Sequence, residues 1–266
     1  MLSRFSQRFS QSLGASLVAI GCIFAVGVLQ VSQLNLLTSQ TNPVSKEALQ
    51  QELELEKLRL NLLQKTPALG FDNLIANWTF LNFLVYFGDD EARAKTSYAL
   101  SPEYFKIIVD RDPRFLQAYI GLSTSISMYA AMPQKSVALM EKGLKSMSPQ
   151  TPPKSYYVWR YKGIDELLFL GDANAARQSF EKAAEWASTY SDEESKAVAG
   201  FSRKTAEFLR RNPNSKLAQV NSWAMVLSNT TDKRAQQIAI SRIEALGGKV
   251  MITPEGTVRI VPPPSD

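Results

Sequence analysis

The longest apolar stretch of the chain lies near its N-terminus and predicts a membrane-spanning helix. Residues 13–31 read LGASLVAIGCIFAVGVLQV and carry no charge. A helix needs roughly 20 mostly apolar residues to cross the hydrocarbon core of a bilayer, and within lipid it satisfies its own backbone polar groups. No Lys, Arg, Asp or Glu occurs between Phe9 and Ser45. We therefore expect an uncleaved signal anchor at residues 13–31.

Two other interpretations of this segment stay open. A cleaved signal peptide needs a small-x-small site after the apolar region, whereas residues 32–40 are rich in Leu, Asn and Gln. A lipoprotein signal needs a lipobox that ends in cysteine, and residues 19–22, Ala-Ile-Gly-Cys, match one loosely. Apolar sequence continues beyond Cys22 to Val31, where a mature lipoprotein usually turns polar. Otherwise Cys22 is an apolar side chain within a membrane helix.

The charges on either side of the anchor predict its orientation. Arg4 and Arg8 precede it, and the first charges after it are Lys46 and Glu47. The positive-inside rule places the basic flank in the cytoplasm. We expect residues 1–12 in the cytoplasm and the body of the chain in a periplasm or a thylakoid-type lumen.

A linker and a stalk helix are predicted over residues 32–70. Residues 45–65 have a helical pattern, with Ser45 as the capping residue. The apolar face of this helix consists of Leu55, Leu58 and Leu62. We expect the helix to pack through these leucines as a stalk or first packing helix, with a short coiled coil as the alternative.

The segment at residues 71–87, FDNLIANWTFLNFLVYF, is the most apolar and aromatic stretch outside the anchor. Its uncharged run from Asn73 to Phe87 is shorter than a membrane crossing requires. A second crossing would return the body to the cytoplasm. We expect a buried core helix here.

The body of the chain has an internal period of 40 residues. Each copy has an aromatic-rich helix, a turn and a second helix with small and large residues at fixed offsets. Four pairs carry the period: Tyr119 with Trp159, Ser136 with Ala176, Met140 with Phe180, and Gly143 with Ala183. Such a period is typical of helical-repeat proteins.

The second copy resembles helix B of a tetratricopeptide repeat, TPR. Ala176, Phe180 and Ala183 follow a turn at residues 171–172 with the small-x3-large-x2-small pattern of that helix. This pattern lets two helices approach closely. The period of 40 is longer than the usual TPR period of about 34, partly because of the linker at residues 148–153.

The start of the preceding copy is also similar to a TPR motif. Asp112-Pro113, followed by Tyr119, looks like the proline that ends one motif and the aromatic residue that begins the next. The resemblance implies a degenerate TPR-like array over residues 71–246. Its four expected units are residues 71–113, 114–150, 154–190 and 191–246.

The anchor together with residues 71–78 and 86–89 looks like anchored bacterial TPR proteins, including ones from photosynthetic bacteria. Some TPR proteins of photosynthetic membranes assist photosystem assembly. The resemblance implies a scaffold or assembly factor that binds protein subunits of a membrane complex on its repeat surface. The alternatives are an enzyme or carbohydrate-binding protein of the periplasm or lumen, and a structural subunit of a larger membrane complex.

The C-terminal residues 247–266 differ in pattern and predict a small β-hairpin and a Pro-rich tail. Residues 249–253 and 257–261 alternate apolar and polar side chains around Pro-Glu-Gly at residues 254–256. Because an isolated hairpin is marginally stable, it should pack on the last helices; a partner-binding strand is the alternative. The predicted fold class is therefore all-α, with an N-terminal transmembrane helix, a TPR-like array and this hairpin.

Charge and composition exclude several function classes. The net charge of +5 is diffuse, and no basic stripe alternates with exposed aromatic residues, so we expect no nucleic-acid partner. Histidine is absent, which removes Ser-His-Asp and Cys-His catalytic systems and the commonest transition-metal ligand.

The remaining motifs do not predict catalysis, a cofactor or a metal. Residues 179–182 match S-x-x-K, but no S-D-N or K-T-G follows. P-loop and G-x-G-x-x-G motifs are absent from the sequence. The carboxylate groups at residues 89–91, 110 and 112, 165–166 and 192–194 have simpler roles at helix ends. We expect a protein that is not an enzyme.

An aromatic cluster at residues 156–161 is the candidate partner-binding site. On a helix its tyrosines and Trp159 cannot all be buried in one seam. Aromatic residues and arginines are the usual anchors of protein contacts. Core packing is the simpler interpretation of these side chains. The alternative is that Tyr156, Arg160 or Tyr161 lines a groove that binds a partner, and these three are the candidate site residues.

Overall fold

The computed structural model describes residues 46–212, 216–229, 233–252 and 258–264, together with residues 21, 24, 26, 27 and 30. The chain divides into two compact units, Met1–Leu49 and Gln50–Asp266. Within the first unit, residues 21, 24, 26, 27 and 30 are helical, and the side chains of Phe24 and Val26 are exposed. Most of the predicted anchor, Cys22 and residues 31–45 lie outside the described residues.

In the part of the chain that the structure describes, none of the helices combines the length and the apolar character that a membrane crossing needs.

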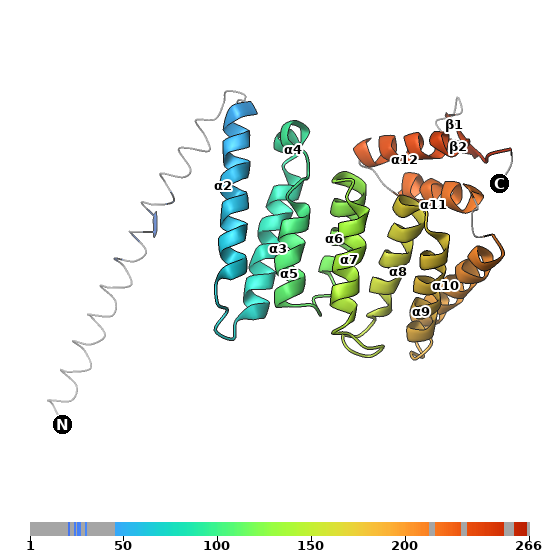
Figure 1. Cartoon of the computed structure of the whole chain (residues 1–266), viewed down its shortest axis with the longest axis horizontal. Coiled ribbons are helices and arrows are strands. Elements are labelled where there is room, and N and C mark those ends of the chain that lie inside the picture. The colour runs from blue at the N-terminus through green and yellow to red at the C-terminus, as the bar shows by residue number, and fades with distance from the viewer. Residues whose placement is uncertain are drawn as a thin grey trace. The chain divides into compact units, whose positions relative to one another are not determined.

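The described residues after position 45 are mostly helical, as predicted, and end in a small antiparallel sheet (Figure 1). The helices are α2 (Lys46–Lys65), α3 (Asp72–Gly88), α4 (Asp90–Thr96), α5 (Ser101–Arg111), α6 (Ala118–Leu122), α7 (Pro133–Leu144), α8 (Tyr156–Asp165), α9 (Ala173–Ala187), α10 (Glu193–Arg211), α11 (Lys216–Asn229) and α12 (Lys233–Ala245). The π-helical segments η1 (Ser123–Tyr129) and η2 (Glu166–Leu170) continue α6 and α8, and the strands are β1 (Lys249–Ile252) and β2 (Val258–Val261).

Two helical hairpins follow the same plan forty residues apart. In the first, α6 and η1 lead to α7, and in the second α8 and η2 lead to α9. The connecting turns contain residues of positive φ at equivalent positions, Ala131 at 54° and Gly171 at 69°. The second helices begin at Pro133 and Ala173. The predicted period therefore corresponds to a repeated structural unit.

Small residues let the two helices of each hairpin approach closely. A Cβ at Gly143 of α7 would lie 1.7 Å from the Oη of Tyr119 on α6. A Cβ at Gly163 of α8 would lie 3.2 Å from the ring of Phe180 on α9. Tyr119 is held in this position because its Oη donates to the carbonyl oxygen of Pro113 at 2.7 Å.

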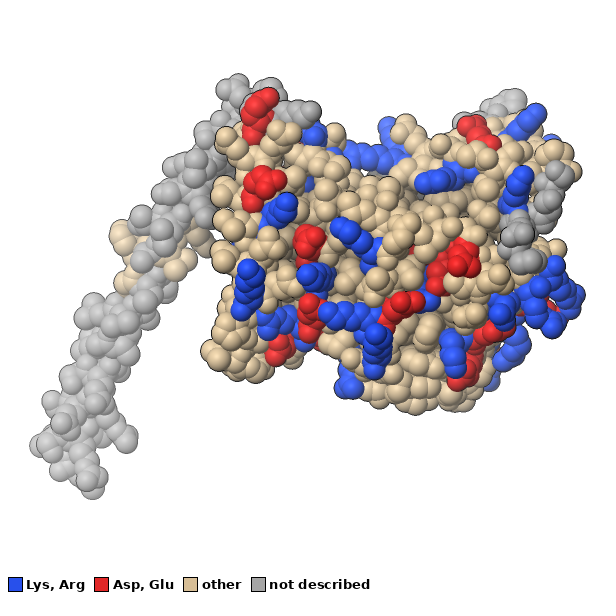
Figure 2. All heavy atoms as spheres, viewed as in Figure 1, with Lys and Arg blue, Asp and Glu red and all other residues tan. Residues whose placement is uncertain are grey.

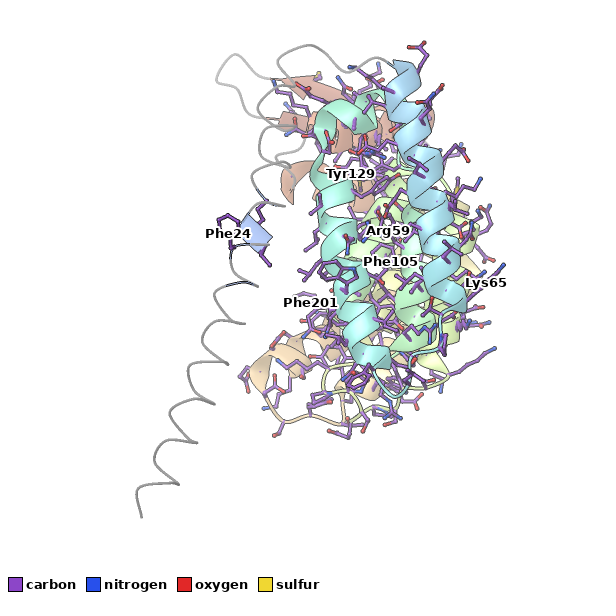
Figure 3. All side chains as sticks on the ribbon, turned by 90° about the vertical axis from the view of Figure 1, so that its left-hand side faces the viewer. Phe24, Arg59, Lys65, Phe105, Tyr129 and Phe201 are labelled. Carbon is purple, nitrogen blue, oxygen red and sulfur yellow. The ribbon has the colours of Figure 1, made fainter. Side chains whose placement is uncertain are left out.

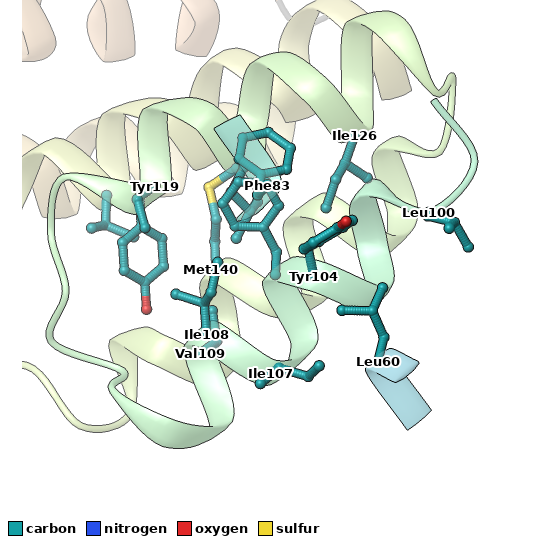
Figure 4. Packing of buried hydrophobic residues seen from close by; sticks show 14 of the residues in the cluster. Leu60, Phe83, Leu100, Tyr104, Ile107, Ile108, Val109, Tyr119, Ile126 and Met140 are labelled. Carbon is teal, nitrogen blue, oxygen red and sulfur yellow. The ribbon is translucent and has the colours of Figure 1, made fainter. Parts of the chain in front are cut away.

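The largest hydrophobic core joins α3, α5, α6 and α7 (Figure 4). Its aromatic centre is Phe83 of α3, whose ring packs edge-on against Phe105 of α5 with the centroids 4.5 Å apart. Met140, which the period pairs with Phe180, is fully buried in this core. The hydrophobic segment at residues 71–87 thus forms a helix that buries one face in the core. Its opposite face, with Leu74, Trp78 and Val85, is exposed, so the expected buried core helix is only half buried.

The described residues between positions 191 and 246 form three helices, α10 to α12, rather than one helical pair. Helix α11 contacts η2, and α12 contacts η1. The fully buried Trp223 of α11 lies edge-on against Phe169 of η2, with the centroids 5.0 Å apart. The last helices therefore cover the π-helical ends of the two hairpins.

An arginine of α12 connects this last part of the stack to the first. Arg234 Nη1 donates to Tyr98 Oη at 2.8 Å, and Nη2 donates to the carbonyl oxygen of Asp90 at 3.0 Å. Asp90 is the first residue of α4. These two hydrogen bonds span 136 and 144 residues of sequence.

Helix α2 packs through a different face from the one that its sequence pattern indicated. Its buried Leu60 and half-buried Leu53 and Leu63 contact the core, whereas Leu55, Leu58 and Leu62 are exposed. Residues of α5 fix this orientation: Tyr104 Oη donates to Glu56 Oε1 at 2.7 Å, and Arg111 Nη2 donates to the carbonyl oxygens of Gln64 and Thr66 at 3.1 and 2.5 Å. The prediction that the 55-58-62 face packs against the rest of the chain is therefore wrong.

The predicted C-terminal hairpin is confirmed. Strands β1 and β2 pair antiparallel, with Val250 opposite Ile260, and both side chains pack on the core that contains Ile243 of α12. Gly248 N donates to the Ile243 carbonyl oxygen at 2.9 Å. The predicted turn at residues 254–256 lies outside the described residues.

Candidate protein-binding surface

Helices α8 and α10, the first helices of two successive units, are connected through their side chains. Three hydrogen bonds connect their side chains: Tyr156 Oη with Ser195 Oγ at 2.9 Å, Tyr157 Oη to Glu194 Oε1 at 2.6 Å, and Arg160 Nη1 to Ser202 Oγ at 3.1 Å. The two residues of each pair are separated by 37 to 42 positions. This separation is close to the repeat period, so the bonds link equivalent helices.

One side of α8 remains partly open to solvent beside α10. Tyr157, Arg160, Tyr161 and Ile164 follow the i, i+3, i+4, i+7 spacing that places side chains on one helix face, and all four are half-buried. The rings of Tyr157 and Tyr161 are stacked, with centroids 6.1 Å apart and planes at 21°. A guanidinium and two phenols are therefore presented together.

Burial governs the ionisation of these groups. Desolvation lowers the pKa of Arg160 and raises the pKa of Tyr161. Burial and the hydrogen bond to Glu194 both raise the pKa of Tyr157. Guanidinium groups stay protonated in proteins, so the surface offers one cation between two neutral hydroxyls at neutral pH.

Helix α10 contributes a line of side chains beside this side of α8. Glu194, Phe201 and Phe208 are spaced at seven residues, two helical turns, and so lie on one line along the helix. Because Glu194 accepts the hydrogen bond from Tyr157, this line lies next to the open side of α8. Phe201 is 63% exposed and Phe208 39% exposed. We call Tyr157, Arg160, Tyr161, Ile164, Glu194, Phe201 and Phe208 the α8–α10 surface.

The sequence-predicted site residues have different positions in the structure. Tyr156 is fully buried and hydrogen-bonded to Ser195, so it packs in the helix interface and does not line a groove. Arg160 and Tyr161 lie on the α8–α10 surface, where partner binding stays a prediction. Sequence reasoning missed Phe201 and Phe208, although their seven-residue spacing from Glu194 was a usable signal.

Charged residues order the start of α10 next to this surface. Asp192 caps the helix, since its Oδ1 accepts from Ser195 N at 3.0 Å, and its pKa is lowered by the hydrogen bonds from Ser195. Lys154 forms ion pairs with Glu194 and Asp192. The hydrogen bond from Lys154 also lowers the pKa of Glu194. Helix α10 therefore starts at a fixed position relative to α8.

A buried carboxylate joins the two repeated hairpins. The side chain of Asp165, at the end of α8, is buried and accepts hydrogen bonds from Ser123 and Ser127 of η1 at 2.6 and 2.5 Å and from Ser136 of α7 at 2.6 Å. Desolvation raises the pKa of Asp165 to about 6. All three donors are hydroxyls of the neighbouring hairpin. The Asp165 carboxylate therefore links the two hairpins through buried hydrogen bonds.

The S-x-x-K residues belong to a second buried polar group. Ser179 Oγ donates to Glu166 Oε2 at 2.6 Å and lies 3.2 Å from Lys162 Nζ. Lys162 also forms an ion pair with Glu166. In contrast, Lys182 is exposed and pairs with Glu185 at 2.7 Å. Because the serine and lysine of the motif point to different environments, they do not form a nucleophile and base pair.

The carboxylate clusters at residues 89–91 and 192–194 lie at helix starts, whereas Asp165 and Glu166 are buried. Asp89 caps α4, with its Oδ1 accepting from Ala92 N at 3.0 Å, as Asp192 caps α10. Across the described residues, no group of three or more Asp, Glu, Cys or His side chains has a metal-binding arrangement. Figure 2 shows Lys, Arg, Asp and Glu interspersed over the face in view.

Comparison of the chain with protein-family models, curated proteins and solved structures found no match. The α8–α10 surface is therefore interpreted from its own geometry.

Proposed function

We propose that this chain is a membrane-tethered, TPR-like helical-repeat protein that binds another protein, and that it scaffolds or assists the assembly of a membrane complex. The observation that carries the proposal is the α8–α10 surface, where Arg160, Tyr161 and Phe201 stay partly exposed along two adjacent helices. Stacked helix pairs create extended binding surfaces, and aromatic and Arg side chains supply most of the binding energy at protein interfaces.

Two observations support the TPR-like interpretation. The hairpins α6–α7 and α8–α9 repeat with the period seen in the sequence. In α9 the small-large-small residues Ala176, Phe180 and Ala183 are all buried, and Phe180 packs on Gly163 of α8. This is the close approach of two helices that the TPR pattern permits.

The uncharged segment at residues 13–31 supports the tether. Its length and lack of charge suit a single crossing helix. A tether increases the effective concentration of a binding surface near membrane partners, so weak contacts become sufficient. In this proposal the N-terminus is cytoplasmic, and the repeats lie in a periplasm or lumen.

Site-specific photo-crosslinking in native membranes tests the binding surface. A photoreactive phenylalanine analogue replaces Tyr161 or Phe201, and the control replaces Lys182, an exposed residue of α9. We expect the same protein to be captured from positions 161 and 201 and not from position 182. Capture from position 182 alone, or capture of nothing from 161 and 201, contradicts the proposed surface.

Protease treatment of sealed vesicles tests the topology. In vesicles with the cytoplasmic face outward, added protease should leave the helical body intact until detergent opens the membrane. Digestion of the body in intact vesicles excludes the proposed orientation.

A further inference from the structure

The first layer of the helical stack has a large apolar face toward solvent. Helices α2 and α3 lie side by side and cover α5 (Figure 3), and Arg59 Nη2 of α2 donates to Asn82 Oδ1 of α3 at 3.2 Å. Most of the exposed large hydrophobic residues of the described chain lie on these helices and the loop between them. We define the α2–α3 face as Leu55, Leu58, Leu62, Phe71, Leu74, Trp78, Leu81 and Val85.

The spacing of these residues is that of a helix-packing seam. The spacing between successive face residues of α3 alternates between three and four positions, at residues 71, 74, 78, 81 and 85. The same spacing occurs on α2, at residues 55, 58 and 62. This is the pattern with which one helix packs against another. Side chains along the seam are strongly exposed, with Leu74 at 62%, Trp78 at 55% and Val85 at 76%.

An uncovered seam is unusual at the end of a helical stack. Terminal repeats normally have a polar outer face because no neighbour covers them. Here α3 has no charged residue between Asp72 and Asp89. Apolar patches of this kind mark interaction sites, and two parallel seams fit an occupant that is itself a layer of helices.

The charges of α2 identify a second copy of the chain as that occupant. The first half of α2 holds Lys46, Glu47, Glu52 and Glu54 and has a net charge of −2. Its second half holds Glu56, Lys57, Arg59 and Lys65 and has a net charge of +2. Two copies related by a two-fold axis present the same surface to each other, so the surface must be self-complementary. An antiparallel pair of α2 helices meets this requirement, because each acidic half faces a basic half.

We propose that two copies of this chain associate through their α2–α3 faces about a two-fold axis, so that α2 and α3 of both copies form a four-helix bundle. Leu58 then lies near the axis, and Glu54 of one copy approaches Lys65 of the other. The interface uses none of the residues of the α8–α10 surface. Dimerisation can therefore be tested separately from partner binding at the α8–α10 surface.

The oligomeric state of the purified full-length chain in mild detergent is the first test, measured by sedimentation with the detergent contribution subtracted. We expect a dimer that Leu81→Asp weakens more than about 100-fold, because a carboxylate is then buried in an apolar seam. Leu81 is 57% exposed in the single chain, so the substitution should leave the melting curve of the monomer unchanged. The matched control, Phe201→Asp on α10, should leave dimerisation intact.

Charge reversal tests the antiparallel arrangement. Glu54→Lys and Lys65→Glu should each weaken the dimer roughly 10-fold, because like charges then meet across the axis. The double variant Glu54→Lys/Lys65→Glu should recover wild-type affinity, because its two halves are again complementary. Mixing the two single variants should give a heterodimer tighter than either homodimer. Both residues are exposed on α2, so the changes should not affect folding.

Three results overturn the proposal: a wild-type chain that is monomeric at all concentrations, a dimer that Leu81→Asp does not weaken, or a double charge reversal that does not restore affinity. A fourth such result is evidence that the α2–α3 face contacts the bilayer. If Trp78 fluorescence in reconstituted vesicles is quenched by brominated lipid, relative to the Trp78→Phe variant, the face contacts lipid instead.

Discussion

The Oη of Tyr119 occupies the space that a side chain at position 143 would need, since a Cβ built on Gly143 lies 1.7 Å from it. This contact sets the distance between α6 and α7. Gly143→Ala should therefore destabilise the protein by about 1–3 kcal/mol, because Tyr119 must move and lose its hydrogen bond to Pro113. Urea unfolding measures the change. The control is Gly200→Ala on α10, where a Cβ meets nothing within 4 Å and the better helix propensity of alanine should be neutral or stabilising.

The turn residues Ala131 and Gly171 should respond in opposite ways to exchange. Both have a positive φ, which costs a residue with a Cβ about 1–2 kcal/mol and glycine much less. Ala131→Gly should raise the melting temperature, and Gly171→Ala should lower it. Calorimetry of the two variants checks the prediction, and a decrease in both would contradict the equivalence of the two turns.

The buried carboxyl of Asp165 should make stability depend on pH. Desolvation raises its pKa from 3.8 to about 6 in the folded state, so between these values the folded protein binds more protons than the unfolded chain. The free energy of unfolding should then decrease by about 3 kcal/mol as the pH rises from about 4 to about 6, and level off above that range.

The variant Asp165→Asn isolates this effect, because the asparagine does not titrate and all other groups are retained. The difference in free energy of unfolding, wild type minus variant, should decrease as the pH rises through this range. Urea titrations at several pH values measure it. An increase with pH would show that the hydrogen bonds from Ser123, Ser127 and Ser136 outweigh desolvation.

The buried pair of Lys162 and Glu166 should show strong coupling. Lys162→Met leaves the Glu166 carboxylate buried with Ser179 as its remaining donor, and removal of one partner of such a pair typically costs about 3–5 kcal/mol. The double variant Lys162→Met/Glu166→Leu should be clearly more stable than the single variant, because no unpaired buried charge remains. Glu141, which also pairs with Lys162 at 3.3 Å, has an exposed side chain. A double-mutant cycle in urea measures the coupling, and additive effects would contradict it.

The repeat was predictable from the sequence because its buried small and large residues recur with one period. Ser136 and Ala176 are both fully buried at equivalent positions, and the turns also coincide. The π-helical segments were not predictable, since η1 and η2 have no simple sequence signature. Their buried polar groups, Asp165 above all, depend on donors from the neighbouring hairpin.

The face of α2 that is buried was also beyond sequence reasoning. Leucine occurs so often in this helix that two apolar faces compete, and both have helical spacing. Tyr104 and Arg111 of α5, more than 40 residues away, decide between them by bonding to α2. For the same reason the sequence left open whether Tyr156 is buried, because its partner Ser195 belongs to the next repeat.

The bonds from Arg234 to Tyr98 and Asp90 have a consequence for the length of this protein. In an open solenoid, units are added or removed without affecting distant ones, since each contacts only its neighbours. Here α12 reaches from the final helices back to α4, so an inserted hairpin would separate the two ends of that connection. A change in the number of hairpins would therefore cost this protein both hydrogen bonds, in addition to the contacts between the neighbouring units.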